Sequence, residues 1–230
     1  IGKKDSLTFL AWNLIAGVIG FFIFSLLGLH SFAGFLIFPP IPEITLSYVL
    51  YAIALGILGA LVALFMGIVM NGMGIAMERA FSEKIITRIL FAGVIIAGVC
   101  YFIPELMFSG ETTIHSIVEN PAEFGILMLL LMAILKIILL ALSFKSGFLG
   151  GPIFPTLFTC TMIGLALSLV FPTVPVGIFV LCTMAAVVTL ALGAPLTASL
   201  LVIVIGSSNP NMSALLVLSS VVALILGITV

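Results

Sequence analysis

The chain has 230 residues, of which 63% are hydrophobic and 7% are charged, and its formal net charge is −1. Soluble domains carry about 25% charged residues, so this composition excludes an ordinary soluble protein, and the near-neutral charge gives no basis for binding nucleic acid. The mean hydropathy of +1.52 and the long apolar runs predict an all-α polytopic membrane protein. A membrane barrel would instead show short alternating segments of about ten residues.

The apolar segments, taken in chain order, predict membrane-embedded helices. About 20 residues are needed to cross the hydrocarbon. Segment 44–77 is longer than this, so it must tilt strongly or break at the glycines near Gly67, Gly72 and Gly74. Segment 195–206 is too short to cross and is expected to be a half-helix. The complete set of segments is 7–29, 44–77, 85–104, 124–144, 152–171, 174–192, 195–206 and 212–230.

Charged residues lie almost entirely between these segments. The stretch 105–123 contains four glutamates and no lysine or arginine. If the N-terminus is cytoplasmic and the spans alternate, every basic cluster falls on the cytoplasmic side and this acidic stretch falls outside, in agreement with the positive-inside rule. The basic and acidic residues at the cytoplasmic junctions are Lys3, Lys4, Glu78, Arg79, Glu83, Lys84, Arg88 and Lys145.

The stretch "SFKSGFLGGPIFPTLF", residues 143–158, interrupts two apolar segments. Pro152 and Pro155 have no N–H, and the glycines before them weaken a helix. Non-helical backbone at membrane depth persists only inside protein or beside water. Because proline favours the first turn of a helix, the sequence predicts a new helix from about Pro152 to Phe171.

The start of such a helix is a candidate anion site, because its first N–H groups are free and carry about half a positive charge. Discontinuous membrane helices often point their N-termini at anionic substrates. "LGAPLTASL", residues 192–200, repeats the pattern with Gly193 and Pro195. "FIPELMFSGETT", residues 102–113, is a third interruption that also fits an external loop. Each break can alternatively be an ordinary kink or tight loop.

Two lysines are candidates for attracting an anion. Lys136 lies in the middle of an apolar segment, where a charge indicates either function or a snorkelling or structurally paired side chain. Lys145 is placed to attract anions at the cytoplasmic mouth, or else only anchors its helix. His30 and His115 are expected to be satisfied or solvated. The cysteines are expected to be small buried hydrophobic residues; they are Cys100, Cys160 and Cys182.

At this point the sequence resembles a known family. "SGFLGGPIFPTLF" is similar to the anion-site signature Gly-x-Phe-x-Pro of CLC chloride channels and chloride/proton antiporters. "MAAVVTLALGAPLTASLLVIV" resembles a later CLC stretch that ends one helix and starts another, and "YFIPELMFSGE" resembles an extracellular segment. "LLLMAILKIILLALSFKSG" resembles the helices before the signature, with Lys136 where a basic residue is common. Order and spacing agree over 85–206.

The resemblance implies broken and tilted helices in inverted repeats, with residues 1–84 as the end of the first repeat and 85–230 as the second. It implies a homodimer with one pore per subunit, parts of 7–77 and 195–230 forming the interface. Chloride or another small anion would be the ligand, the lipid bilayer the environment, and no cofactor or metal is implied. The expected location is the plasma membrane of a prokaryote.

The signature departs from the family pattern. This chain reads Gly151-Pro152-Ile153-Phe154-Pro155, so the phenylalanine is displaced by one place and Pro152 has no N–H. The remaining donors are Ile153 and Phe154, with Gly151 as the hinge and Lys145 at the mouth. The family's Gly-Ser-Gly-x-Pro and Gly-Lys-Glu-Gly-Pro loops and its late tyrosine are not found, which fits the C-terminal portion of a membrane domain. The internal proton glutamate aligns with Ser31.

Three functions remain open at the level of sequence. The first is transport of chloride, or of fluoride, nitrate or another small anion, as a channel or an antiporter. The second is a non-conducting module that folds, packs and dimerises, and the third is a carrier of organic solutes. An enzyme is not expected, because the chain contains no His-Glu-x-x-His, Gly-x-Ser-x-Gly or phosphate-binding loop.

Overall fold

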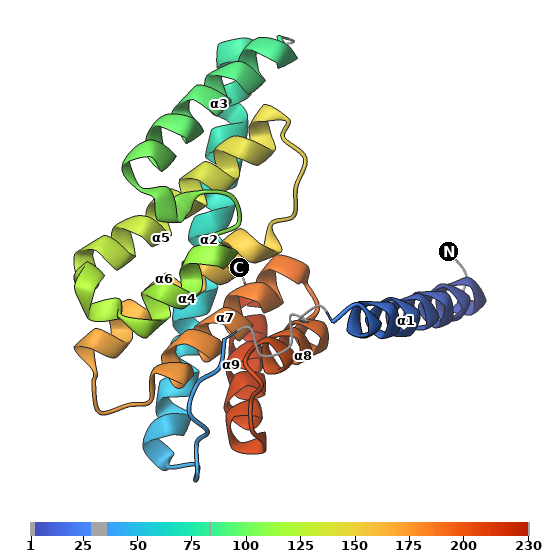
Figure 1. Cartoon of the computed structure of the whole chain (residues 1–230), viewed down its shortest axis with the longest axis vertical. Coiled ribbons are helices and arrows are strands. Elements are labelled where there is room, and N and C mark those ends of the chain that lie inside the picture. The colour runs from blue at the N-terminus through green and yellow to red at the C-terminus, as the bar shows by residue number, and fades with distance from the viewer. Residues whose placement is uncertain (1–2, 29–35, 83, 230) are drawn as a thin grey trace.

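A computed structural model describes residues 3–28, 36–82 and 84–229, and all of its regular structure in these ranges is helical (Figure 1). Six of the helices are long and apolar enough to cross a membrane, which confirms an all-α polytopic membrane protein. In chain order the elements are α1 (Lys3–Leu26), α2 (Leu46–Phe81), α3 (Ile85–Phe102), the 3₁₀ turn η1 (Pro104–Leu106), α4 (Glu111–Glu119), α5 (Pro121–Ser146), α6 (Ile153–Val170), α7 (Val176–Leu192), α8 (Pro195–Ile205) and α9 (Pro210–Thr229).

Helix α7 forms the centre of the packed helices. Every residue from Gly177 to Thr189 is buried, as expected for a helix that is apolar around its whole circumference. Helices α2, α6, α8 and α9 all pack against it, and α5 covers the far side of α6. The core is therefore a set of helices around one buried helix rather than two separate bundles.

Small residues allow these helices to approach closely. A Cβ added at Gly164 of α6 would lie 2.5 Å from the Cα of Val180 in α7. A Cβ added at Gly59 of α2 would lie 2.3 Å from the Cβ of Ala186, also in α7. Such small-residue contacts drive helix association in lipid, where the hydrophobic effect between helices is weak. They place both α2 and α6 directly on the backbone of α7.

Helix α2 is one uninterrupted helix of 36 residues. At 1.5 Å per residue it is about 54 Å long, well beyond the thickness of the hydrocarbon. Of the two alternatives for this segment, the break at the glycines is wrong, and a long helix of this kind must cross at a steep tilt. Gly67 and Gly72 remain helical with open space around them. Glu78 and Arg79 therefore lie in the last turns of α2 rather than in a connecting loop.

The segment before α2 is hydrogen-bonded to residues around the turn between α8 and α9. The N–H of Leu36 donates to the carbonyl of Ile205 at 3.0 Å. The amides of Asn209 and Asn211 both donate to the carbonyl of Ile41, at 2.7 and 3.1 Å. Side chains at the turn between α8 and α9 thus satisfy the backbone of a non-helical segment, which Figure 1 shows beside α7 and α9.

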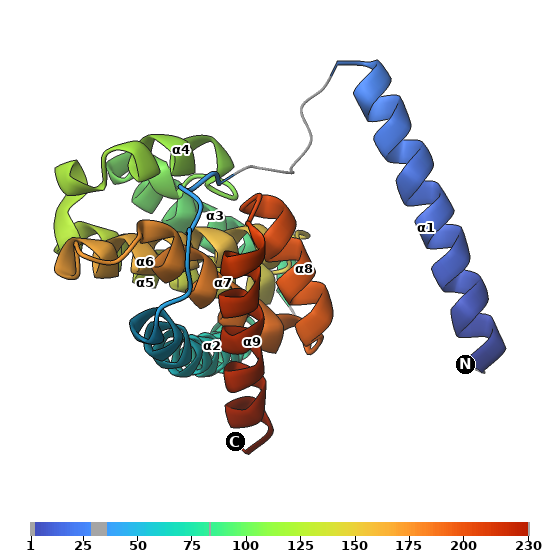
Figure 2. The same cartoon turned by 90° about the horizontal axis from the view of Figure 1, so that it is seen from below.

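Helix α1 stands apart from the packed helices in both views (Figures 1 and 2). Its apolar span Thr8–Leu26 has no buried residue, and Trp12 is 66% exposed. A helix this apolar can be stable only against lipid or another protein surface.

The acidic stretch 105–123 is more ordered than the expected external loop. It contains η1 and the nine-residue helix α4, and Ile114 and Ile117 of α4 are buried where α4 packs on α6. Helix α5 starts earlier than predicted, and Gly125 at φ 72° and ψ 164° divides its first turn from the rest. The stretch is therefore a packed cover over the end of α6.

We predict that Gly164→Ala destabilises the protein. The new methyl group would meet the backbone of Val180, which cannot move aside without separating α6 from α7, so the cost should be about 1–3 kcal/mol. The measurement is the thermal unfolding midpoint in detergent. Gly98→Ala is the matched control, because no atom lies within 4 Å of its Cβ position and alanine favours a helix. Equal midpoints for the two variants would contradict the packing described here.

Candidate functional site

The predicted interruption between α5 and α6 is confirmed. Helix α5 ends at Ser146, and Gly147 adopts the left-handed conformation at φ 104°. The N–H groups of Gly147 and Phe148 donate back to the carbonyls of Phe144 and Ser143, at 3.3 and 3.1 Å. This is the usual glycine-terminated helix end. Residues 147–152, exposed in this chain, then cross to the start of α6.

The first turn of α6 has few N–H groups to offer. Of the five residues 152–156, Pro152 and Pro155 have no N–H, and the N–H of Thr156 already donates to the carbonyl of Pro152 at 3.1 Å. The N–H of Ile153 has no backbone acceptor in the described part of the chain. Its side chain packs against the hydrophobic core, so only its peptide N–H is a candidate donor at the interruption.

Two basic side chains lie at the end of α5. The Nε of Arg88 in α3 donates to the carbonyl of Ser146 at 3.3 Å, at the last residue before the interruption. The Nζ of Lys145 would lie 3.6 Å from a Cβ on Gly74 of α2, so this side chain runs along α2. Arg88 was not singled out from the sequence, because only the fold brings α3 to this helix end.

A cavity of about 780 Å³, the break cavity, opens beside the interruption. Its walls come from α3, η1, α5 and the start of α6. It brings together three of the candidates named from the sequence, Gly151, Phe154 and Lys136, with Gly150 between them. The other lining residues include Cys100, Leu106, Phe108, Ser143 and Pro155.

Lys136 is buried, with 3% of its surface exposed. Its Nζ donates to the carbonyl of Leu106 at 3.0 Å and to the carbonyl of Phe108 at 2.8 Å. It also lies 4.7 Å from the centre of the Phe158 ring, a cation–π distance. Lys136 is therefore paired with the carbonyls of Leu106, at the end of η1, and of Phe108, just after it, and does not snorkel. The sequence carried no signal for these acceptors.

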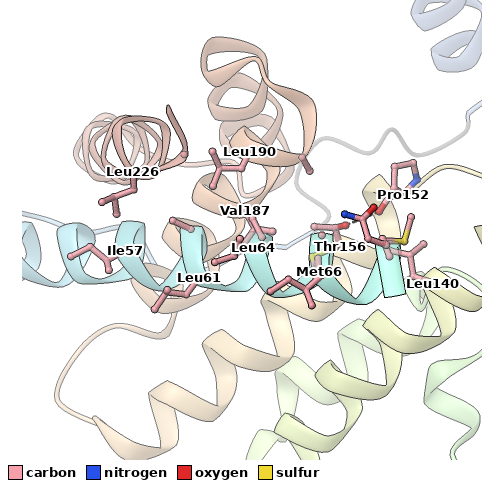
Figure 3. A pocket seen from close by; sticks show the side chains of 18 residues that line it. Ile57, Leu61, Leu64, Met66, Leu140, Pro152, Thr156, Val187, Leu190 and Leu226 are labelled. Atoms are coloured by element: carbon pink, nitrogen blue, oxygen red, sulfur yellow. Dashed lines mark hydrogen bonds between the residues drawn. The ribbon is translucent and has the colours of Figure 1, made fainter. Parts of the chain in front are cut away.

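A second cavity of about 760 Å³, the α2 cavity, lies on the other side of the same turn (Figure 3). It runs along α2 from Ile57 to Asn71, and Pro152 and Thr156 lie at its end. Val187 and Leu190 of α7 and Leu226 of α9 form another wall. Its lining is almost wholly apolar, so it suits lipid or protein rather than an ion.

The remaining candidates are more scattered. Ile153 and Lys145 line neither of these two cavities. His115 is exposed on α4, and the three cysteines are buried, as expected. His30 and Ser31 lie outside the described residues. The second predicted interruption is confirmed, because Gly193 is left-handed at φ 64° and α8 begins at Pro195.

The model of one protein family matches almost the whole chain. That family is described as voltage-gated chloride channel, and the match covers residues 3–227. The protein is a member of the voltage-gated chloride channel family. The helix interruptions at 147–153 and 193–195 lie in two of the stretches whose sequence resembles the CLC family.

Curated relatives of this CLC protein carry the name "Putative ion-transport protein YfeO". One from Escherichia coli O1:K1 / APEC is 34% identical over 102 residues, which is 44% of this chain and 24% of the relative. One from Escherichia coli strain SMS-3-5 / SECEC is 33% identical over 114 residues, 48% of this chain and 27% of the relative. The match to a relative from Escherichia fergusonii has the same extent. The matched region is thus about a quarter of the length of these relatives, whose name supports ion transport in general terms.

We predict that Gly147→Ala destabilises this CLC protein at the end of α5. A left-handed conformation costs a residue with a Cβ roughly 1–2 kcal/mol, so the thermal unfolding midpoint should fall. Gly150→Ala tests the same segment without that strain, because Gly150 does not have a positive φ and no atom lies within 4 Å of its Cβ position. A Gly147→Ala protein as stable as Gly150→Ala would mean that the helix end differs from the one described.

Proposed function

We propose that this CLC protein moves a small anion, chloride in the first place, through a site formed by peptide N–H groups at the start of α6. One observation supports this most strongly: α5 stops and α6 starts beside a cavity that also contains a buried lysine. Peptide N–H groups at a helix start bind anions through hydrogen bonds and the helix dipole. No side-chain acid is needed for such a site.

The residues proposed for the site are those predicted from the sequence. Gly151 gives an anion close access to the backbone, because it has no side chain, and Ile153 and Phe154 supply the N–H groups at the first turn. Lys145 would raise the anion concentration at the cytoplasmic mouth. With two prolines in this turn the site has few donors, so weak binding is expected, as conduction requires.

The proposed assembly is the one that the resemblance to the family implies. We propose a homodimer in the plasma membrane of a prokaryote, with residues 1–84 as the end of the first repeat and 85–230 as the second. The exposed apolar surface of α1 is consistent with a subunit contact or with lipid. An alternative is a non-conducting module that folds and dimerises without carrying ions, and another is a carrier of fluoride or nitrate. In neither case is an enzyme activity proposed.

The proposed function is tested by anion flux. The full-length gene product is reconstituted in liposomes loaded with chloride, and efflux is followed with a chloride electrode after the potential is clamped. We expect efflux above that of empty liposomes, and exchange of the external anion for fluoride or nitrate ranks selectivity. Simultaneous measurement of proton movement separates an antiporter from a channel. A folded dimer with no flux of any of these anions would support the structural module instead.

We further predict that an ester at Ile153 weakens anion binding. Replacing the peptide N–H by oxygen removes one donor but keeps the side chain, and loss of a hydrogen bond to a charged group costs about 1.5–3 kcal/mol. The readout is bromide affinity by calorimetry. Val176 is a matched control, because it also follows a proline and begins a helix, yet that helix is α7 and not α6, which follows the interruption. Equal bromide affinity in the two ester proteins would exclude the N–H of Ile153 as a donor.

A further inference from the structure

Lys136 carries a positive charge that its protein partners only partly balance. An ammonium group has three N–H donors. Two of them reach the carbonyls of Leu106 and Phe108, and the third has no acceptor within the described residues. Carbonyl groups and an aromatic ring supply partial negative charge, whereas a buried cation costs several kcal/mol unless a full negative charge is near.

The surroundings of Lys136 provide no such charge. Among the described residues that line the break cavity, none is an aspartate or a glutamate. The one other ionisable side chain on its wall is the thiol of Cys100. Glu105, in η1, is partly exposed and does not line the cavity. No carboxylate in the described lining of the cavity therefore supplies the counter-charge.

The break cavity has room for an anion beside Lys136. At about 780 Å³ the break cavity is large enough for several water molecules and an anion. Lys136 shares it with Gly150 and Gly151 at the interruption. An anion that enters at the interruption can thus meet a positive charge without leaving this cavity.

From these observations we infer that the third N–H of Lys136 forms a second anion subsite, separate from the N–H groups at the start of α6. The ligand class is a small monovalent anion such as a halide or nitrate. This inference rests on the proposed anion transport and deepens it. Two anions in one cavity repel each other, so occupation of one subsite speeds departure from the other, as multi-site conduction requires.

The 104–110 segment holds the lysine in place for this role. Phe108 is left-handed at φ 51° and Gly110 at φ 86°, and a Cβ on Gly110 would collide with the ring of Phe158 at 2.3 Å. The turn thus directs the carbonyls of Leu106 and Phe108 at the ammonium group. The ring of Phe158 contacts the same group. Lys136 also lines the break cavity, so an anion in this cavity has access to the ammonium group.

The test is to locate bromide in crystals of the full-length protein by anomalous scattering. We expect one peak at the start of α6 and a second within hydrogen-bond distance of the Lys136 Nζ. Lys136→Gln keeps N–H groups for the two carbonyls but removes the charge, so the second peak should disappear. Lys136→Arg keeps charge and donors and should retain it. Lys84→Gln, which removes a charge from an exposed residue at the start of α3, should retain both peaks.

A solution measurement accompanies the diffraction. Bromide affinity at the second subsite should fall at least about tenfold in Lys136→Gln, from the loss of a charged hydrogen bond. A peak at α6 alone, with unchanged bromide affinity in Lys136→Gln, would overturn the second subsite and leave the proposed function standing. Peaks at neither place, with no anion flux, would overturn both. If Lys136→Gln does not fold, the presence or absence of the second peak in the unaltered protein still decides the inference.

Discussion

Cationic side chains hold carbonyl groups at the places where the helices of this protein end. Arg88 reaches the carbonyl of Ser146 at the end of α5, and Lys136 reaches the carbonyls of Leu106 and Phe108 after η1. In an apolar surrounding every exposed peptide group must find a partner. The helices can stop in the middle of an otherwise apolar chain because these long side chains, arriving from other helices, satisfy the last carbonyls. The proposed anion site depends on that arrangement, since it leaves N–H groups rather than carbonyls to face the interruption.

The same arrangement explains how a chain with few charged residues can bury a lysine in the middle of a helix. Lys136 is a fully buried basic residue in a helix that otherwise contacts the core, where an unpaired charge is costly. It is kept in place by two carbonyls and one ring, and no carboxylate is among the described residues that line the break cavity. A cation in this position makes a cavity positive without closing it with a salt bridge. For an anion pathway that is a useful combination, because a nearby carboxylate would neutralise the attraction.

Rigid packing positions this site. Gly59 and Gly164 let α2 and α6 contact the backbone of α7, and α7 is buried along most of its length. Helix α6, which carries the first turn of the site, is therefore packed closely on α7, while residues 147–152 just before it are exposed. The α2 cavity, on the other face of the same turn, is apolar and open to lipid or protein (Figure 3). The turn thus lies between a cavity lined by a buried lysine and a cavity with no charged residue in its lining.

The sequence alone determined that this is a helical membrane protein of the CLC family, where its helices are interrupted, and where α6 and α8 begin, because apolar run length and the positions of proline and glycine act locally. It also singled out Lys136, Gly151 and Phe154, which the fold brings to one cavity. It could not decide whether α2 bends, because glycine permits a break but only neighbouring helices determine whether a helix remains straight. It left the role of Lys136 open and gave no sign that Arg88 would reach the carbonyl of Ser146, or that Lys136 would reach the carbonyls of Leu106 and Phe108. Those partners lie 28 to 58 residues away in sequence, and only tertiary packing, which sets the distances between helices, decided which peptide groups they would reach.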